Sequence, residues 1–194
     1  MDGPWRAHDR RRRARRLGTP GAVPGALRPL GGPRPAGQLF VVGGAAMALE
    51  YDGGRVTRDV DAAFAPASAV REIAAELGEL HGLEPDWIND AAKGFLPGQD
   101  DDARTVFDSE SLLVQVPSPE YLLAMKLHAA RDERDLSDAA TLYNVSGYTT
   151  AEEGAALLRR TYSDALLLPR HRYIVDDVAE RARVLRVLGG PAAE

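Results

Sequence analysis

Two stretches decide the fold: residues 39–47, LFVVGGAAM, and residues 59–65, DVDAAFA. The first begins with a short apolar run that ends at Gly43-Gly44, which is typical of a buried strand. The Ala-, Met- and Leu-rich segment after it predicts a short helix that starts at the glycines. The second stretch alternates at its start and predicts another strand, which Pro66 ends.

The rest of the chain shows helix and strand patterns that turn from mixed to purely helical. Ser118 followed by Pro119 is typical of a helix start, and Thr150 with Glu153 has the spacing of a capping box. The expected elements are a helix capped by Ser68 with apolar positions Val70, Ile73, Ala74 and Leu77, a short helix around Trp87, strands at 104–107 and 112–116, and helices from 118, at 150–162 and at 174–188, the last ending at Gly189-Gly190.

These elements predict an α+β fold, in which a small mixed β-sheet with helices packed on it precedes a C-terminal helical part. We expect residues 37–117 to form the sheet-containing core and residues 118–194 the helical region. Residues 1–36 hold nine arginines among many prolines and glycines, so we expect a disordered tail there. The tail is interpreted as solvated, as an upstream mis-assigned start, or as a basic arm that touches RNA.

The composition excludes several kinds of site. The absence of cysteine excludes disulfides, thiolate zinc sites and cysteine nucleophiles. No apolar run approaches the roughly 20 residues of a membrane span, and no apolar segment follows the basic N-terminus as in a secretory signal. We therefore expect no membrane contact and a cytoplasmic location. The net charge is -5 although the N-terminus is basic, so a polyanionic substrate must meet a local basic patch or a bridging metal.

The Gly43-Gly44 turn and the Asp59-Val60-Asp61 strand each point to a phosphate or metal site. A glycine pair between strand and helix lets the backbone approach a ligand closely, although a tight turn without function gives the same pattern. Asp59 and Asp61 are two apart in a strand and therefore project from one face. Adjacent carboxylates repel each other, and Mg²⁺ relieves that repulsion. The alternative is an edge strand with its acids in water.

The combination resembles the polymerase-β-like nucleotidyltransferase superfamily, in which a Gly-Gly turn is followed by Asp-hydrophobic-Asp. More closely, VVGGAAMALEYDGGRVTRDVDAAF, DWINDAAKGFLP and SPEYLLAMKLHAARDERDLSDAATL are similar to the minimal bacterial nucleotidyltransferases and to AbiEii-type toxins of toxin–antitoxin systems. The resemblance covers about residues 38–170. It implies transfer of a nucleoside monophosphate from a nucleoside triphosphate (NTP), with loss of pyrophosphate and a two-metal style of catalysis.

The resemblance also implies roles for individual residues. Asp59 and Asp61 would ligate Mg²⁺, and Gly43 and Gly44 would hold the β- and γ-phosphates. Three further residues are candidates for nucleotide binding, although an arginine here can equally be solvated or ion-paired: Arg55, Arg58 and Lys93.

Lys126, Asp135 and Asp138 are the remaining catalytic candidates, because they match the Lys…Arg-Asp-x-x-Asp segment of AbiEii-type proteins. The two acids lie three apart on one helix face and can instead form structural ion pairs with Lys126 or Arg134. Many members of the superfamily place a third carboxylate on a later strand. The equivalent position here is interpreted as Gln115, which can coordinate weakly but cannot act as a general base.

The sequence thus predicts a Mg-dependent nucleotidyltransferase with an acceptor hydroxyl on tRNA or another RNA, a protein or a small molecule. The AbiEii resemblance implies a toxin of a toxin–antitoxin or phage-defence pair, with an antitoxin as partner. Because Gln115 is neutral, the alternative is a weak or inactive nucleotide-binding or protein-interaction module on the same fold. The four histidines are interpreted as surface or packing residues, because they lack metal-ligand spacing.

Overall fold

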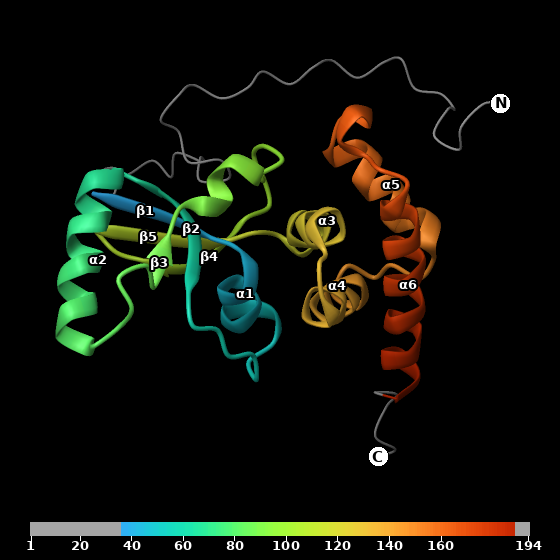
Figure 1. Cartoon of the computed structure of the whole chain (residues 1–194), viewed down its shortest axis with the longest axis horizontal. Helices are drawn as coiled ribbons and strands as arrows, with labels where there is room; N and C mark the ends of the chain where they lie inside the picture. The colour runs from blue at the N-terminus through green and yellow to red at the C-terminus, as the bar shows by residue number, and fades with distance from the viewer. Residues whose placement is uncertain (1–35, 189–194) are drawn as a thin grey trace.

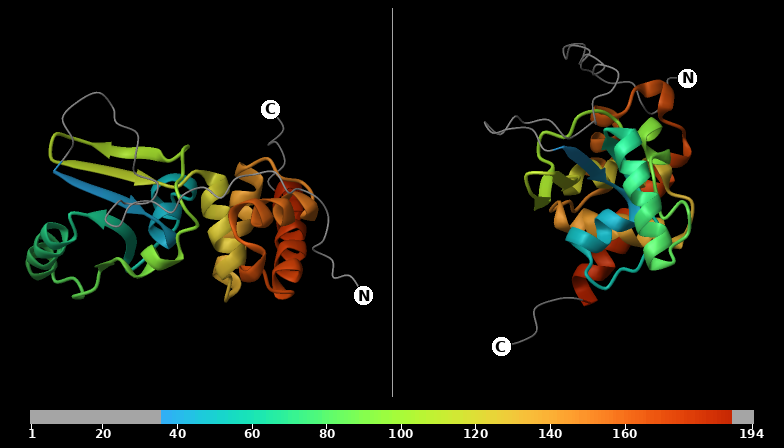
Figure 2. Two further views of the ribbon diagram at one scale, coloured as in Figure 1. Left: turned by 90° about the horizontal axis from the view of Figure 1, so that it is seen from above. Right: turned by 90° about the vertical axis from the view of Figure 1, so that its left-hand side faces the viewer.

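The structure, a computed structural model, describes residues 36–188. Figure 1 shows a β-sheet with helix α2 beside it, and four helices, α3 to α6, at the other end of the molecule. The view from above in Figure 2 shows the same two parts next to each other along the long axis. The predicted tail and the predicted stop at Gly189-Gly190 lie outside the described residues.

The sheet has five strands in the order β3-β2-β1-β5-β4. Strand β1 lies at its centre, antiparallel to β2 and parallel to β5. The edge strand β3 is parallel to β2, and β4 is antiparallel to β5. The strands are β1 (Gly37–Val41), β2 (Val60–Ala65), β3 (Ile88–Asn89), β4 (Arg104–Asp108) and β5 (Leu112–Val116).

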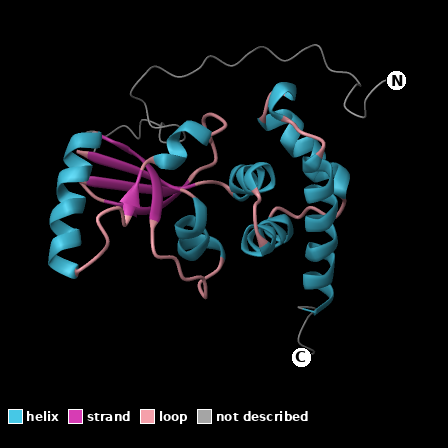
Figure 3. Ribbon diagram, in the orientation of Figure 1, coloured by secondary structure: helices cyan, strands magenta, loops and turns pink. Residues whose placement is uncertain are grey.

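Helices dominate the second half of the chain, so the predicted α+β class with a C-terminal helical part is confirmed (Figure 3). Within residues 36–188, no helix combines the length and the apolar composition that a membrane span requires. The helical elements are α1 (Gly43–Ala46), the π-helix η1 (Met47–Tyr51), α2 (Ala67–His81), the 3₁₀ turn η2 (Ala91–Phe95), α3 (Pro119–Ala129), α4 (Glu133–Val145), α5 (Ala151–Thr161), the 3₁₀ turn η3 (Asp164–Leu166) and α6 (Arg170–Leu188).

The central strand is buried on both faces, as its continuous apolar run predicts. Val41 packs in the main hydrophobic cluster, which extends through α3, α4, α5 and α6, whereas Phe40 and Val42 pack in a second cluster with Ala63 and Tyr121. Because one continuous cluster joins the sheet to the C-terminal helices, the two parts share a core. The α1–η1 segment lies at their junction (Figure 1).

The start of α3 is fixed by the predicted cap and by a buried acid that the sequence analysis did not identify. The Ser118 hydroxyl accepts the Tyr121 N–H at 3.3 Å, which confirms the cap. Asp100, only 7% exposed, accepts the Ser118 N–H at 2.6 Å and its hydroxyl at 3.0 Å. The loop before β4 therefore anchors the helix that carries Lys126. The predicted capping box of Thr150 and Glu153 is also present in α5.

Two local predictions were wrong between residues 66 and 90. The N-cap of α2 is Pro66 rather than Ser68, and the chain after Trp87 forms strand β3 rather than a short helix. The Trp87 indole donates to the Ala74 carbonyl at 2.9 Å, so it holds the following segment against α2 and lets it pair with β2. Periodicity did not reveal β3, because two residues are too few to show a pattern.

The apolar positions predicted for α2 are only partly buried. Val70 packs against the main cluster, but Ile73 is 56% and Leu77 is 39% exposed. One side of this helix therefore presents apolar side chains to solvent.

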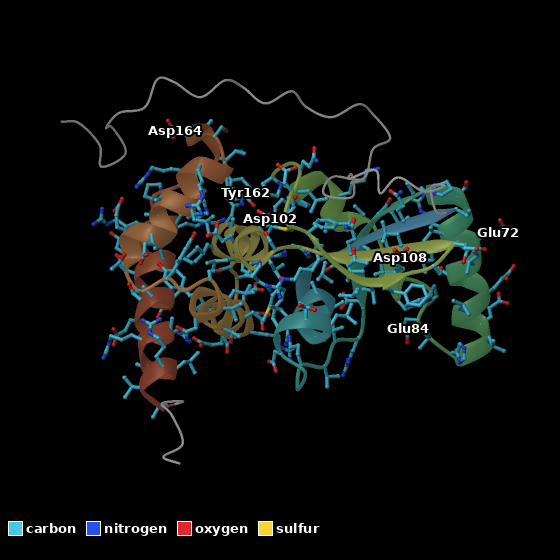
Figure 4. The ribbon with its side chains drawn as sticks, turned by 180° about the vertical axis from the view of Figure 1, so that it is seen from behind. Glu72, Glu84, Asp102, Asp108, Tyr162 and Asp164 are labelled. Atoms are coloured by element: carbon cyan, nitrogen blue, oxygen red, sulfur yellow. The ribbon has the colours of Figure 1, made fainter. Side chains whose placement is uncertain are left out.

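Helix α6 begins at Arg170, before the predicted start near residue 174. His171 closes its first turn, since the ring Nδ1 accepts the Leu168 N–H at 2.9 Å. The ring is 1% exposed and lies beside His128, which stacks on Tyr162 with 4.1 Å between ring centroids. Figure 4 shows Tyr162 in the helical part, at the opposite end of the molecule from Glu72 on α2. Both histidines therefore pack, as the sequence analysis expected.

His171 is expected to make stability fall in mild acid. Burial, followed by the nearby His128 and Arg170 charges, lowers the pKa of His171 below its ordinary 6.5. Its contribution is therefore fully present above pH 6.5 and is lost as the pH falls through the lowered pKa, because only the unfolded state gains the proton readily. Urea unfolding between pH 7.5 and 5 should give a shallower pH dependence for His171→Gln than for the wild type; equal slopes would contradict this assignment.

Candidate active site at the glycine turn

The glycine turn lies directly against the second aspartate. The Val42 N–H donates to the Asp61 carbonyl at 2.8 Å, which holds the end of β1 beside the start of β2. Gly43 has φ +64, and a Cβ placed on it would stand 3.1 Å from Asp61 Oδ2. A Cβ on Gly44 would stand 3.2 Å from the Thr57 hydroxyl and 3.3 Å from Arg55 Nη2. The two stretches that the sequence analysis linked are thus in contact.

The predicted short helix that starts at the glycines is present over residues 43–51. Its α-helical part covers only Gly43–Ala46 and continues as the π-helix η1. The bare backbone of Gly43 and Gly44, rather than a long helix, is what brings the chain close to the acidic side chains.

Gly43→Ala is expected to disrupt this contact. A β-carbon at φ +64 adds backbone strain on the order of 1 kcal/mol and pushes the Asp61 carboxylate from its place. We expect a modest fall in melting temperature and a much larger loss of Mg²⁺-dependent nucleotide binding. Gly82→Ala, with a similar φ of +65 and nothing within 4 Å of its Cβ, is the matched control for strain alone. Equal loss of nucleotide binding in both variants would exclude a local role for Gly43.

Asp61 and Asp59 differ in their surroundings. Asp61 is half-buried on β2, and burial raises its pKa above the ordinary carboxyl value, with the Asp59 charge adding to the rise. A side-chain hydrogen bond from Asn89 and the nearby Lys126 and Arg131 charges act in the opposite direction. Asp59 is exposed and lies one residue before β2. The two carboxylates therefore repel each other, and this repulsion adds to the effect of burial on the pKa of Asp61.

Thr57 holds Asp59 through its side-chain hydroxyl. Its hydroxyl lies 3.1 Å from both the Asp59 carbonyl and Asp59 Oδ1. The same hydroxyl lines the space beside Gly44. The loop that joins η1 to β2 therefore presents one carboxylate and one hydroxyl next to the glycine turn.

Gln115 lies on the same face of the sheet as Asp61 but on the far side of β1. Phe40 pairs with Ala63 on one side and with Gln115 on the other, and Asp61 is two residues before Ala63. Gln115 Oε1 is buried and has no hydrogen-bond partner among residues 36–188. Within the same residues, no three His, Cys, Asp or Glu side chains converge on one metal-sized position. Within the part of the chain that the structure describes, no third acidic side chain joins Asp59 and Asp61 at a metal-sized position.

Lys126, Asp135 and Asp138 form an ion cluster that also includes Arg55. Lys126 Nζ on α3 lies 2.8 Å from Asp135 Oδ1 and 2.8 Å from Asp138 Oδ2, both on α4, so the predicted ion pairs of Lys126 with these two acids are present. Arg55 Nη2 lies 3.1 Å from the same Asp138 oxygen, which the sequence analysis did not foresee. The side chains of Arg55, Lys126 and Asp138 are 13%, 10% and 6% exposed, so this part of the cluster is buried.

The cluster joins the glycine turn to the helical part. Arg55 Nη2 lies beside Gly44, and the same nitrogen donates to Asp138 on α4. Its Nε is buried and has no hydrogen-bond partner within the described residues, so Arg55 keeps an unused donor. Lys126 is both part of the cluster and one of the charges that act on Asp61. The Asp59–Asp61 pair and the ion cluster are therefore neighbours.

The other predicted nucleotide-binding residues are less constrained. Arg58 is exposed in the loop before β2, and Lys93 is exposed on η2. The sequence analysis missed three residues that the structure places at the site: Thr57, Asn89 and Arg131. The segment that contains Asn89 had been noted for its resemblance to related chains, but residue type alone gave asparagine no role.

Comparison with known proteins gives one family match. The model of a family described as nucleotidyltransferase of unknown function (DUF6036) matches residues 26–147. The match covers more than half of the chain and includes the glycine turn, both aspartates and the ion cluster. No curated protein and no solved structure matched the chain significantly. The chain belongs to the DUF6036 family of nucleotidyltransferases of unknown function.

Proposed function

We propose that this protein is a Mg²⁺-dependent enzyme that transfers a nucleoside monophosphate from an NTP to an acceptor hydroxyl. The observation that carries the proposal is the contact between the glycine turn and Asp61, with Arg55 beside Gly44. A triphosphate that lies along this turn meets bare backbone on one side and a guanidinium on the other. Those are the groups that recognise phosphate oxygens.

Asp59 and Asp61 fit a divalent cation. Mg²⁺ prefers one or two carboxylates together with substrate phosphates and water, and the half-buried Asp61 with its raised pKa is a carboxylate that gains from such a partner. Bound there, the ion would neutralise negative charge at the phosphates and orient the acceptor. One metal needs no more protein ligands than these two, whereas a second would need oxygens from the substrate or from Gln115, whose Oε1 is unpartnered.

The reaction forms one bond and breaks one bond. The acceptor oxygen bonds to the α-phosphorus, the bond from that phosphorus to the bridging oxygen of pyrophosphate breaks, and the hydroxyl proton leaves to solvent or to Asp59. Arg55 would hold the pyrophosphate portion through the guanidinium nitrogen beside Gly44, and the exposed Arg58 and Lys93 are further candidates for phosphate contact. Lys126 would act on the site mainly through its charge near Asp61.

The acceptor is tRNA or another RNA, a protein hydroxyl or a small molecule. The likeness of the chain's motifs to AbiEii-type proteins favours a toxin of a toxin–antitoxin or phage-defence pair, with an antitoxin protein as its partner. Residues 37–194 hold 15 Lys and Arg against 27 Asp and Glu, and this acidic charge disfavours a long RNA acceptor unless a partner or the arginine-rich N-terminus helps to bind it.

The first test is transfer of α-labelled ATP, GTP, CTP or UTP to total tRNA, to total protein and to the chain itself, with and without Mg²⁺. Label that appears only with Mg²⁺ and disappears in the Asp59→Asn, Asp61→Asn double variant supports the proposal. The same label with the double variant, or binding of no NTP at all, would overturn it.

The competing function is a nucleotide-binding or protein-interaction module without transfer activity. It is favoured by the absence of a third acid beside Asp59 and Asp61 within residues 36–188. The enzyme and a nucleotide-binding module both predict that NTP and Mg²⁺ raise the melting temperature, whereas a pure protein-interaction module predicts no such rise. Only the enzyme releases pyrophosphate, so a pyrophosphate assay on the same samples separates the two.

A further inference from the structure

The strand next to Asp61 carries an asparagine whose two amide atoms have different partners. Strand β3 pairs in parallel with β2, and in this register Asn89 stands directly across from Asp61. Asn89 Oδ1 accepts the Ala91 N–H at 3.0 Å. Paired positions on neighbouring strands send their side chains to the same face of the sheet, and Asn89 acts on Asp61 as a hydrogen-bond donor that lowers its pKa. Because the oxygen is engaged with Ala91, the amide nitrogen is the group that donates to Asp61.

We propose that Asn89 is a positioning residue that orients the Asp61 carboxylate for Mg²⁺, an inference that rests on the proposed function. A carboxylate has two oxygens, and a donor fixed on one of them leaves the other turned to a cation. Groups that hold metal ligands in this way commonly change metal affinity by about 10- to 100-fold when removed. Asn89 itself is held, because its oxygen is tied to the backbone of η2.

Asn89 also holds the start of the η2 turn, which carries Lys93. The hydrogen bond to Ala91 begins the η2 turn, and the Asp90 carbonyl accepts the Lys93 N–H at 3.0 Å within the same turn. One side chain therefore links the position of Asp61 to that of the segment carrying Lys93. Gln115, on β5, stands one strand further from β2 and cannot serve this purpose, since β1 lies between them.

The experiment compares Mg²⁺ affinity in variants that separate the two hydrogen bonds. Asn89→Ser keeps a short acceptor for the Ala91 N–H but cannot reach Asp61. We expect the Mg²⁺ dissociation constant, measured by calorimetry with MgCl₂ alone, to be about tenfold larger than that of the wild type. The melting temperature of the metal-free protein should be nearly unchanged. Asp90→Asn is the matched control, because Asp90 pairs with Arg71 at 2.6 Å on the surface and should leave Mg²⁺ affinity unchanged.

Asn89→Asp is expected to increase the stabilisation by Mg²⁺, whereas Asn89→Ser weakens Mg²⁺ binding. It keeps the oxygen that accepts from Ala91 but places a second carboxylate across from Asp61, so the metal-free protein should melt at a lower temperature. Mg²⁺ should then raise its melting temperature by more than it raises that of the wild type, because the ion relieves the new repulsion.

The outcomes separate the two proposals. Wild-type protein that binds Mg²⁺ neither alone nor together with an NTP would overturn the proposed function. Wild-type protein that binds Mg²⁺, with Asn89→Ser equal to it, would overturn the role of Asn89 alone and leave the proposed function standing. Asn89→Ser with tighter binding, or Asn89→Asp with no larger gain from Mg²⁺, would also contradict the positioning role.

Discussion

Replacing either Asp59 or Asp61 with asparagine is expected to lower nucleotide transfer by about 1,000-fold or more. Each substitution removes one charge from the pair that would hold the cation, and a metal ion contributes several kcal/mol of charge stabilisation in such transfers. The loss should be larger for Asp61, since it is half-buried against Gly43, whereas the exposed Asp59 can be replaced in part by water. Initial rates of label transfer against Mg²⁺ concentration measure both effects.

The Asp61→Asn variant has an internal check on folding. Burial raises the pKa of Asp61, so the stability that its proton supports is full below the ordinary carboxyl pKa of 3.8 and is lost as the pH rises through the raised value. At neutral pH its charge therefore opposes folding in the absence of metal. A neutral amide should raise the metal-free melting temperature while transfer is lost. Nucleotide transfer that persists in Asp61→Asn would contradict the assignment of Asp61 as a metal ligand.

Asp138→Ala is expected to destabilise the protein by about 3–5 kcal/mol, because it leaves two buried cations without their shared carboxylate. Asp138 Oδ2 lies 3.1 Å from Arg55 and 2.8 Å from Lys126, and its side chain is 6% exposed. Urea unfolding monitored by circular dichroism measures the loss. The size of the effect follows from burial, since exposed ion pairs contribute at most about 1 kcal/mol.

Asp135→Ala is the matched control for Asp138→Ala. Its carboxylate pairs with Lys126 at the same 2.8 Å but is 26% exposed, and removing it leaves Lys126 with Asp138. We expect a clearly smaller loss of stability. Equal losses would mean that burial does not set the strength of the cluster, and no loss for Asp138→Ala would remove it from the structural core of the site.

The ion cluster also bears on the sequence-based idea that Asp135 or Asp138 replaces a third catalytic acid. Both carboxylates already bind Lys126, and Asp138 binds Arg55 as well. Their charges are therefore occupied in holding the two cations beside the glycine turn. This arrangement favours a positioning role, in which Asp138 aims Arg55 at Gly44, over proton transfer.

Much of the fold could be read from local pattern. The apolar run before Gly43, the Ser118 cap and the capping box at Thr150 each depend on residues within a few positions of one another, so the sequence alone predicts them. Strand β3 escaped prediction because its two residues are held by Trp87 against α2 and by pairing with β2, and both contacts depend on tertiary packing.

The same division runs through the site. The sequence by itself predicted that an Asp-x-Asp segment lies near a glycine turn, because the chain between them is short, and Asp61 on β2 does lie against Gly43. Asp59 lies one residue before β2, so the two-residue period of a strand does not fix the direction of its side chain. Only the tertiary structure decided that Asn89 stands across from Asp61 and that Arg55 meets Asp138, 83 positions away in the chain. Sheet order and the packing of α4 on the glycine-turn segment set these pairings, and no local period encodes contacts between distant segments.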